Sequence, residues 1–139
     1  MESNQESVFD NAMKRYQSGI PPSELISDFE SLTEQSPNNS AAWTCLAWLQ
    51  LLCEKNDEAL RSARMSVKIN RQDPQARINL SLALLETKSK GVREHIDFVK
   101  RIEVLLPDIE KELQTSIEDG LNRRPQWQSL IKIKEWLEL

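Results

Sequence analysis

The chain has 139 residues, of which 39% are hydrophobic and 29% charged, and this balance is too apolar for a disordered protein. A formal net charge of -4 at pH 7 argues against a general nucleic-acid binder, because such proteins are usually basic. No apolar run approaches the roughly 20 residues that a membrane-spanning helix needs. The sequence therefore predicts one compact domain, over residues 1–139, that neither inserts into a membrane nor binds nucleic acid.

The composition also predicts an all-α fold. The sequence contains only three glycines and one tyrosine, and it lacks the alternating apolar pattern of a half-buried strand. The N-terminal segment Met1–Ser7 is polar and acidic, without the basic and apolar regions of a secretory signal, so we expect a cytoplasmic location. Cys45 and Cys53 would lie about 12 Å apart on one helix, too far for a disulfide, and are predicted to be free thiols.

Helix boundaries are marked along the first two-thirds of the chain. The segment Pro21–Glu24 places prolines and an acid at the start of a helix. Ser40 is the predicted N-cap of the next helix, and Asp73 caps a later one that has Pro74 in its first turn. The segment Lys88–Gly91 then predicts a break before a further helix.

The C-terminal third predicts two more amphipathic helices. In the first, which follows Pro107, apolar residues recur every four positions, and Asp119-Gly120 is the predicted stop. Another helix is predicted near the C-terminus, and its apolar positions are Trp127, Leu130, Ile131, Ile133, Trp136 and Leu137.

An internal repeat links the middle of the chain. Ala42 and Ala76 are 34 residues apart, and so are Leu46 and Leu80. A period of 34 residues is that of the tetratricopeptide repeat, in which each unit is a pair of helices. Self-similarity at this spacing therefore predicts stacked helical pairs.

The central unit, residues 40–73, resembles the tetratricopeptide family. Trp43, Leu46 and Ala47 match the first-helix pattern of tryptophan, leucine and a small residue, and Ala59 matches the alanine of the second helix. The unit departs from the pattern where Gln50 replaces the tyrosine, Ala63 the second-helix aromatic and Arg71 the terminal proline. The small residues would let two antiparallel helices approach closely.

Neighbouring units follow in phase. In residues 6–39, Phe9 takes the tryptophan place, Tyr16 the tyrosine place and Phe29 the aromatic place. A third unit, residues 74–106, fits if its turn loses one residue. The resemblance implies a right-handed superhelical solenoid of about three antiparallel helix pairs. Residues 107–139 are then expected to be helices that cap the last apolar face, and docking onto a partner is the alternative.

The sequence carries no catalytic or metal-binding motif that we recognise. His95 is the one histidine, and it is expected on or near the surface of the third unit. A phosphate-binding loop, a dinucleotide-binding glycine motif and a zinc-binding HExxH motif are all missing, so we expect no cofactor, metal, small-molecule substrate or enzyme activity. Arg61, Arg64, Lys68 and Arg71 form one helical stripe, which is interpreted as a solvated outer face.

The family resemblance implies a binding site as well as a fold. In such repeats the first helix of each unit lines a concave groove, which would hold a peptide of another protein. The lysine, asparagine and arginine clamp that some members use for a C-terminal carboxylate is incomplete here, because Cys45 takes the place of its middle asparagine. The expected groove is instead centrally apolar, and its predicted binding residues are Lys14, Thr44, Trp48, Leu52, Ile78, Asn79 and Leu82.

Trp48 is the expected anchor of this groove, because Trp43 already occupies the tryptophan place of the repeat. On this hypothesis, Trp48→Ala weakens partner capture and leaves the melting temperature nearly unchanged. The predicted function is a non-enzymatic adaptor or assembly factor that binds an apolar or amphipathic peptide. The alternative is a structural subunit that docks into a larger complex through its C-terminal helices. A small regulatory enzyme or a nucleic-acid binder is the third hypothesis.

Overall fold

The computed structural model describes residues 2–139, with side chains described from Val8 onward, so the segment Met1–Ser7 lies outside the described side chains. Within the described part, every regular element is a helix. The helices are α1 (Glu2–Gln17), the short 3-10 helix η1 (Pro22–Glu24), α2 (Ile26–Gln35), α3 (Ser40–Leu52), α4 (Asn56–Ile69), α5 (Pro74–Glu86), α6 (Val92–Leu105), α7 (Pro107–Arg123) and α8 (Gln128–Trp136). No described helix combines the length and the hydropathy that crossing a membrane requires.

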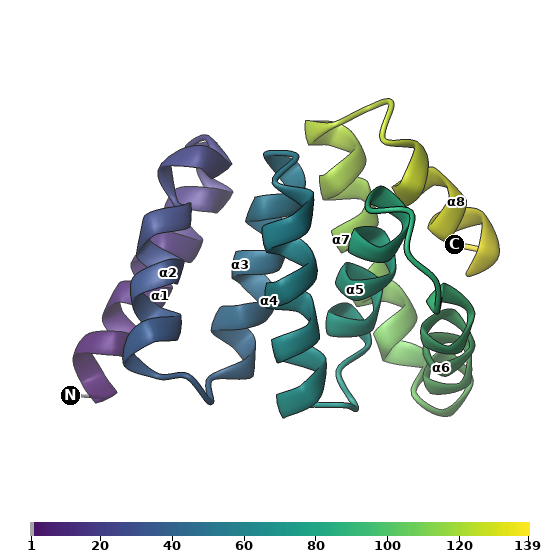
Figure 1. Cartoon of the computed structure of the whole chain (residues 1–139), viewed down its shortest axis with the longest axis horizontal. Coiled ribbons are helices and arrows are strands. Elements are labelled where there is room, and N and C mark those ends of the chain that lie inside the picture. Colours follow the sequence, from purple (N-terminus) through teal and green to yellow (C-terminus); the bar gives the residue numbers. More distant parts are fainter. Residues whose placement is uncertain (1) are drawn as a thin grey trace.

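The first six α-helices form a solenoid of antiparallel pairs (Figure 1). Each helix packs chiefly on its neighbours in the chain, so that α3 contacts α4, α4 contacts α5, and α5 contacts α6. The last two helices depart from this pattern, because α8 packs on α5 as well as on α7, and α7 contacts Trp48 of α3 through Gly120. Figure 1 shows α7 crossing behind α5, with α8 at the same end of the molecule as α6.

Small residues allow the central helices to pack closely, as the repeat pattern predicts. Ala47 of α3 and Ala59 and Ala63 of α4 are fully buried. A methyl group at these positions fills the narrow space between two helix axes without forcing them apart. Larger side chains, including Leu80 and Leu84 of α5, then fill the space between the second and third helix pairs.

Local signals set most of the helix boundaries. The Asp73 carboxylate caps α5 by accepting a hydrogen bond of 2.9 Å from the Gln75 N–H, as predicted. For α3 the prediction is wrong by one residue, because Asn39 is the N-cap and accepts from the Ala42 N–H at 3.2 Å. Gly91 precedes α6 with a φ of 106°, a left-handed conformation that glycine adopts without steric cost.

The predicted stop at Asp119-Gly120 is wrong, because α7 continues through Gly120 to Arg123. Gly120 is instead a packing glycine. A Cβ atom built there would lie 2.6 Å from Leu130 Cδ2 of α8 and 2.8 Å from Trp48 Cη2 of α3. Only a residue without a side chain lets α7 approach α3 and α8 this closely.

The C-terminal helices close the largest hydrophobic core. Ile117 of α7 and Leu130 and Ile133 of α8 are fully buried in one cluster with Ile78 and Leu82 of α5. These two α5 residues belong to the predicted groove, so α7 and α8 cover part of the surface on which the sequence places the partner. The chain's own C-terminal segment thus occupies that part of the solenoid.

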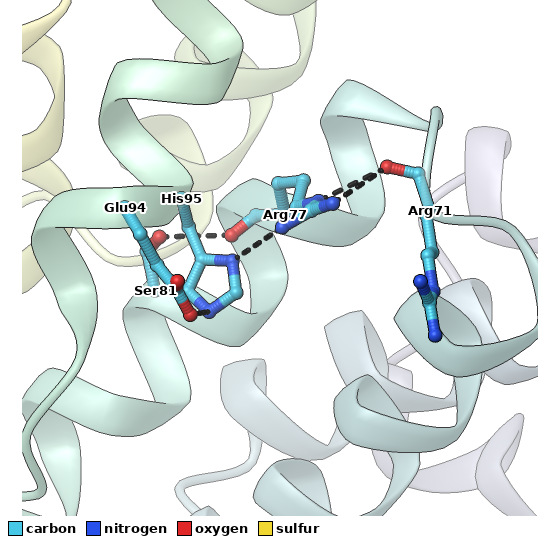
Figure 2. Close-up of polar contacts among 5 residues, drawn as sticks. All are labelled: Arg71, Arg77, Ser81, Glu94 and His95. Carbon is cyan, nitrogen blue, oxygen red and sulfur yellow. Dashed lines mark hydrogen bonds and ion pairs between the residues drawn. The ribbon is translucent and has the colours of Figure 1, made fainter.

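His95 is buried, with 7% of its surface exposed, which corrects the expectation of a surface position. Figure 2 shows its ring between Arg77 of α5 and Glu94 of α6. The Arg77 guanidinium lies 3.0 Å from Nδ1 and also donates two bonds to the Arg71 carbonyl. Because arginine only donates, Nδ1 must be the accepting nitrogen and Nε2 carries the proton, 3.5 Å from Glu94 Oε1. Burial lowers the pKa of His95, with a further contribution from Arg77 that Glu94 opposes.

This environment predicts that acidification destabilises the protein. The unfolded chain binds a proton at His95 near pH 6.5, whereas the folded chain takes it up only at lower pH. The contribution of neutral His95 to the free energy of unfolding is therefore fully present above about pH 6.5, and it is lost as the pH falls below that value. Urea unfolding at about pH 7.5 and about pH 5.5 should show this loss in the wild type and a smaller loss in His95→Gln. An equal pH dependence in both proteins would contradict the assignment.

Candidate functional site

A pocket of about 220 Å³ opens between α1, α2, α3, α5 and α7. Most of its wall is apolar or aromatic and comes from Met13, Tyr16, Phe29, Cys45, Trp48 and Leu49. Its polar lining residues are Thr44 of α3, Gln75 and Asn79 of α5, and Ser116 and Asp119 of α7. The pocket therefore joins residues of all three helix pairs to the C-terminal segment.

One end of the pocket is closed by a polar cluster between α1 and α7. The Tyr16 hydroxyl donates to the Asp119 carboxylate and accepts a 2.8 Å bond from the Trp48 indole N–H. Arg123 donates to Asp119 at 3.0 Å and to the Tyr16 carbonyl at 3.0 Å, and its guanidinium lies 3.8 Å from the centroid of the Tyr16 ring. This cluster binds the first helix pair directly to the C-terminal segment.

Trp48, the predicted anchor, lies in the pocket wall but also contributes to the packing of α7 and α8. Its indole is half-buried and contacts the ring of Trp127, the N-cap residue of α8, with 5.6 Å between centroids. The close approach of Gly120 and the hydrogen bond to Tyr16 hold the same ring. We therefore expect Trp48→Ala to lower stability, contrary to the expectation from the sequence, so this variant would not separate binding from folding.

Two other predicted binding residues line the pocket and already have polar partners. Asn79 is fully buried, accepts a 2.8 Å bond from the Gln75 side chain and donates a 3.0 Å bond to the Thr44 carbonyl. The Thr44 hydroxyl donates to the Ser40 carbonyl at 2.9 Å and is hydrogen-bonded to Ser66 of α4. Their polar groups link helices within the solenoid.

The remaining four predicted residues lie outside the pocket. Lys14 is exposed on α1, and Leu52 is half-buried against the largest core cluster. Ile78 and Leu82 are covered by α7 and α8. The structure thus places Thr44, Trp48 and Asn79 at the pocket. Leu52, Ile78 and Leu82 share a core cluster with Trp48 but do not line the pocket, and Lys14 is exposed on α1.

Sequence reasoning did not assign several pocket residues to the site. Cys45 does occupy a groove position of the repeat pattern, so the register offered a signal for it. Ser116 and Asp119 belong to the non-repeating segment, where no register indicates which residues face the groove. Their position depends on how α7 crosses α3.

The pocket's ionisable groups are not poised for acid–base or nucleophilic chemistry. Burial raises the pKa of the Cys45 thiol to about 12, with a smaller contribution from Asp73, so the reactive thiolate is rare at neutral pH. Burial and the hydrogen bond to Asp119 also raise the pKa of Tyr16. Among the described residues, histidine, cysteine, aspartate and glutamate side chains form no group of three that would hold a metal ion. The geometry suits non-covalent binding.

This architecture defines an all-helical repeat solenoid, and comparison with known proteins agrees. The translocator chaperone SycD of the Yersinia enterocolitica type III secretion system, in an alternative-dimer crystal structure, superposes with a TM-score of 0.68. The two chains are 17% identical, and the match covers 91% of this chain and 96% of SycD. A second solved structure, MamA, matches with a TM-score of 0.62 and 12% identity, over 96% of this chain and 76% of MamA. Identities this low establish the fold alone.

The tetratricopeptide-repeat family model matches residues 29–61, which include most of α2, all of α3 and the start of α4. Those residues match a tetratricopeptide repeat, and the chain as a whole shares its all-helical fold with the two solved structures. No curated protein sequence matches the chain. Protein–protein interaction is the function that repeat solenoids of this type support.

Proposed function

We propose that the chain is a non-enzymatic adaptor or assembly factor whose concave pocket receives an apolar side chain of a partner protein segment. The observation that carries this proposal is the pocket itself, which has an apolar wall and opens between two elements far apart in the sequence. Its volume of about 220 Å³ is below the roughly 300–1,000 Å³ of small-molecule sites. A single large side chain is a better match for that space than a cofactor or metabolite.

The polar lining residues support a peptide rather than a free hydrophobic molecule. Gln75 of α5 and Ser116 of α7 both line the pocket and are half-buried, so their side chains remain accessible to the backbone of a bound peptide. Burying one apolar anchor while satisfying a few backbone groups at the edge is a common way for a protein to hold an extended or helical peptide. SycD, whose fold this chain shares, is itself a chaperone of a translocator.

A pocket-filling substitution tests the proposal without removing a core contact. Leucine at Ser116 should occupy the pocket from the α7 side, and Thr115→Leu adds the same side chain at an exposed neighbouring position. Binding peptides would first be selected against the wild type from a random phage-displayed library, and their affinities would be measured by fluorescence anisotropy. We expect Ser116→Leu to weaken the affinity for these peptides about thirtyfold and Thr115→Leu to weaken it less than about twofold.

Circular dichroism melts of both variants serve as the folding control. Selected peptides that bind Ser116→Leu as tightly as they bind the wild type would show that the pocket is not the binding site. If the selected peptides shared no apolar residue, the proposal that the pocket receives an apolar side chain would be wrong.

A further inference from the structure

The junction between α6 and α7 exposes three consecutive apolar residues. Val104 is 80% exposed, Leu105 72% and Leu106 55%. The junction is nevertheless ordered by hydrogen bonds from the Leu106 N–H to the Ile102 carbonyl and from the Ile109 N–H to the Leu106 carbonyl. Exposing consecutive apolar residues to water is energetically unfavourable. Such a run on an ordered surface is therefore typical of a site that a partner covers.

This apolar junction continues along the outer side of α6 onto α8. One hollow is lined by Val104 and Leu105 together with Lys100, and a second hollow combines Lys100 with Trp136 of α8. Because Lys100 lines both hollows, they form one surface at the end of the solenoid where Figure 1 places α6 and α8. We call it the α6 surface. Its exposed residues include Lys100, Val104, Leu105 and Trp136, and the buried Ile96 and half-buried Val92 lie beneath them.

The α6 surface also carries three cations that form no salt bridge within 4.0 Å in the described part of the chain. Arg93 lines one hollow, Arg101 the other and Lys100 both. None of these three cations forms a salt bridge with another described residue, in contrast to Arg15, Arg123 and Arg124. From Arg93 to Leu105 the surface extends about 18 Å along the helix, at about 1.5 Å per residue, which is the length of about three helical turns. Apolar contact area and unmatched cations are thus interleaved over a length suited to one short helix.

The distribution of charge selects among possible occupants. Asp97 lies within the surface. Burial raises the pKa of Glu103, with a further contribution from Glu110 that Lys100 opposes, so carboxylates lie beside the cations at the junction. A membrane or a nucleic acid presents phosphates across the whole surface and would place them against these carboxylates, whereas a helix can place its carboxylates opposite the cations alone. A two-fold contact with a second copy centred on Lys100 would bring like charges together. A helix of a different protein avoids both kinds of repulsion when its carboxylates lie opposite the cations.

We propose that the α6 surface is a second docking surface, which binds an acidic amphipathic helix of a partner protein. Apolar side chains of that helix would pack on Val104, Leu105 and Trp136, and its carboxylates would pair with Lys100 and the flanking arginines. The surface lies on different helices from the open side of the concave pocket, so this proposal does not depend on the proposed function of that pocket.

The test uses a designed peptide of about 18 residues with leucines on one helical face and glutamates beside them. Its titration into the ¹⁵N-labelled full chain should shift amide signals of α6 and the indole signal of Trp136. The double variant Val104→Ser/Leu105→Ser and the single variant Lys100→Glu should each weaken binding at least about tenfold. Ser116→Leu should leave the affinity unchanged, which separates this surface from the pocket.

Matched controls lie elsewhere on the chain. Val8→Ser removes an exposed valine from α1, and Lys68→Glu reverses an exposed charge on α4, and both should bind the peptide as the wild type does. A peptide with lysines in place of the glutamates should not bind. Equal binding of the two peptides, or peptide shifts confined to the pocket, would overturn the proposal.

Two further outcomes would assign the surface to another occupant and overturn the proposal. The first is self-association in sedimentation velocity that Val104→Ser/Leu105→Ser abolishes. The second is co-sedimentation with phosphatidylcholine–phosphatidylserine vesicles that the same double variant abolishes. The wild type is expected to sediment as a single monomeric species and to remain in the supernatant.

Discussion

Replacing Trp127 with alanine is expected to lower the free energy of unfolding by about 3–5 kcal/mol. Trp127 is 2% exposed, and its indole contacts Trp48 of α3. Its N–H donates a 2.8 Å bond to Glu86, and the Arg124 guanidinium lies 4.4 Å from the ring centroid. Alanine would leave a cavity and remove the hydrogen bond to the half-buried Glu86 at the point where α8 meets the solenoid.

Trp136 on the same segment provides the matched control, because its side chain is 41% exposed. Urea unfolding followed by circular dichroism should place Trp136→Ala within about 1 kcal/mol of the wild type. The melting temperature should fall by about 4 °C for each kcal/mol lost, so only Trp127→Ala should show a large shift. Equal costs for the two variants would show that α8 is not docked as described.

Replacing Gly120 with alanine is expected to destabilise the protein by about 1–2 kcal/mol. Overpacking typically costs about 1–3 kcal/mol, and alanine recovers up to about 1 kcal/mol through its better helix propensity. The new methyl group would lie 2.6 Å from Leu130 and 2.8 Å from Trp48. Leu130 is fully buried and Trp48 is held by Tyr16 and Trp127, so α7 itself has to move outward.

Cys45 reports this movement, because its thiol lines the pocket beside α7. In a Cys53→Ser background, Gly120→Ala should raise the rate at which a thiol reagent modifies Cys45. Asn122→Ala, at an exposed site on the same helix, should change neither the stability nor the rate. A Gly120→Ala protein with wild-type stability and an unchanged Cys45 rate would contradict the close packing of α7 on α3.

Covering of the concave face has a consequence for binding. Ile78 and Leu82 are buried under α7 and α8, while Met13, Cys45 and Ser116 line the pocket that stays open, which is the binding site on the proposed function. A partner that needs only one anchor side chain can enter this opening with the helices in place. A longer partner helix along α5 would have to displace the C-terminal segment and lose the contacts of Trp127.

The helical pairs could be predicted from the sequence because their determinants are local or recur at a fixed spacing. Asp73 caps α5 through a hydrogen bond two residues away, and Pro74 suits a first helical turn. Ala47 and Ala59 mark the close packing of α3 on α4, which are adjacent in the chain. In a solenoid each helical pair contacts chiefly its neighbours. The 34-residue repeat is therefore enough to predict how these pairs stack.

Tertiary structure alone decided what happens at the concave face. The local sequence predicts a helix stop at Gly120, yet the lack of a side chain there lets α7 approach Trp48, 72 positions earlier in the chain. His95 reads as a surface residue, yet α5 buries it through Arg77. Such contacts depend on where the superhelix carries the end of the chain, and residues 107–139 do not continue the period that would indicate it. The sequence by itself therefore determined the solenoid of helical pairs, whereas the path of α7 and α8 determined which of the predicted binding residues remain accessible.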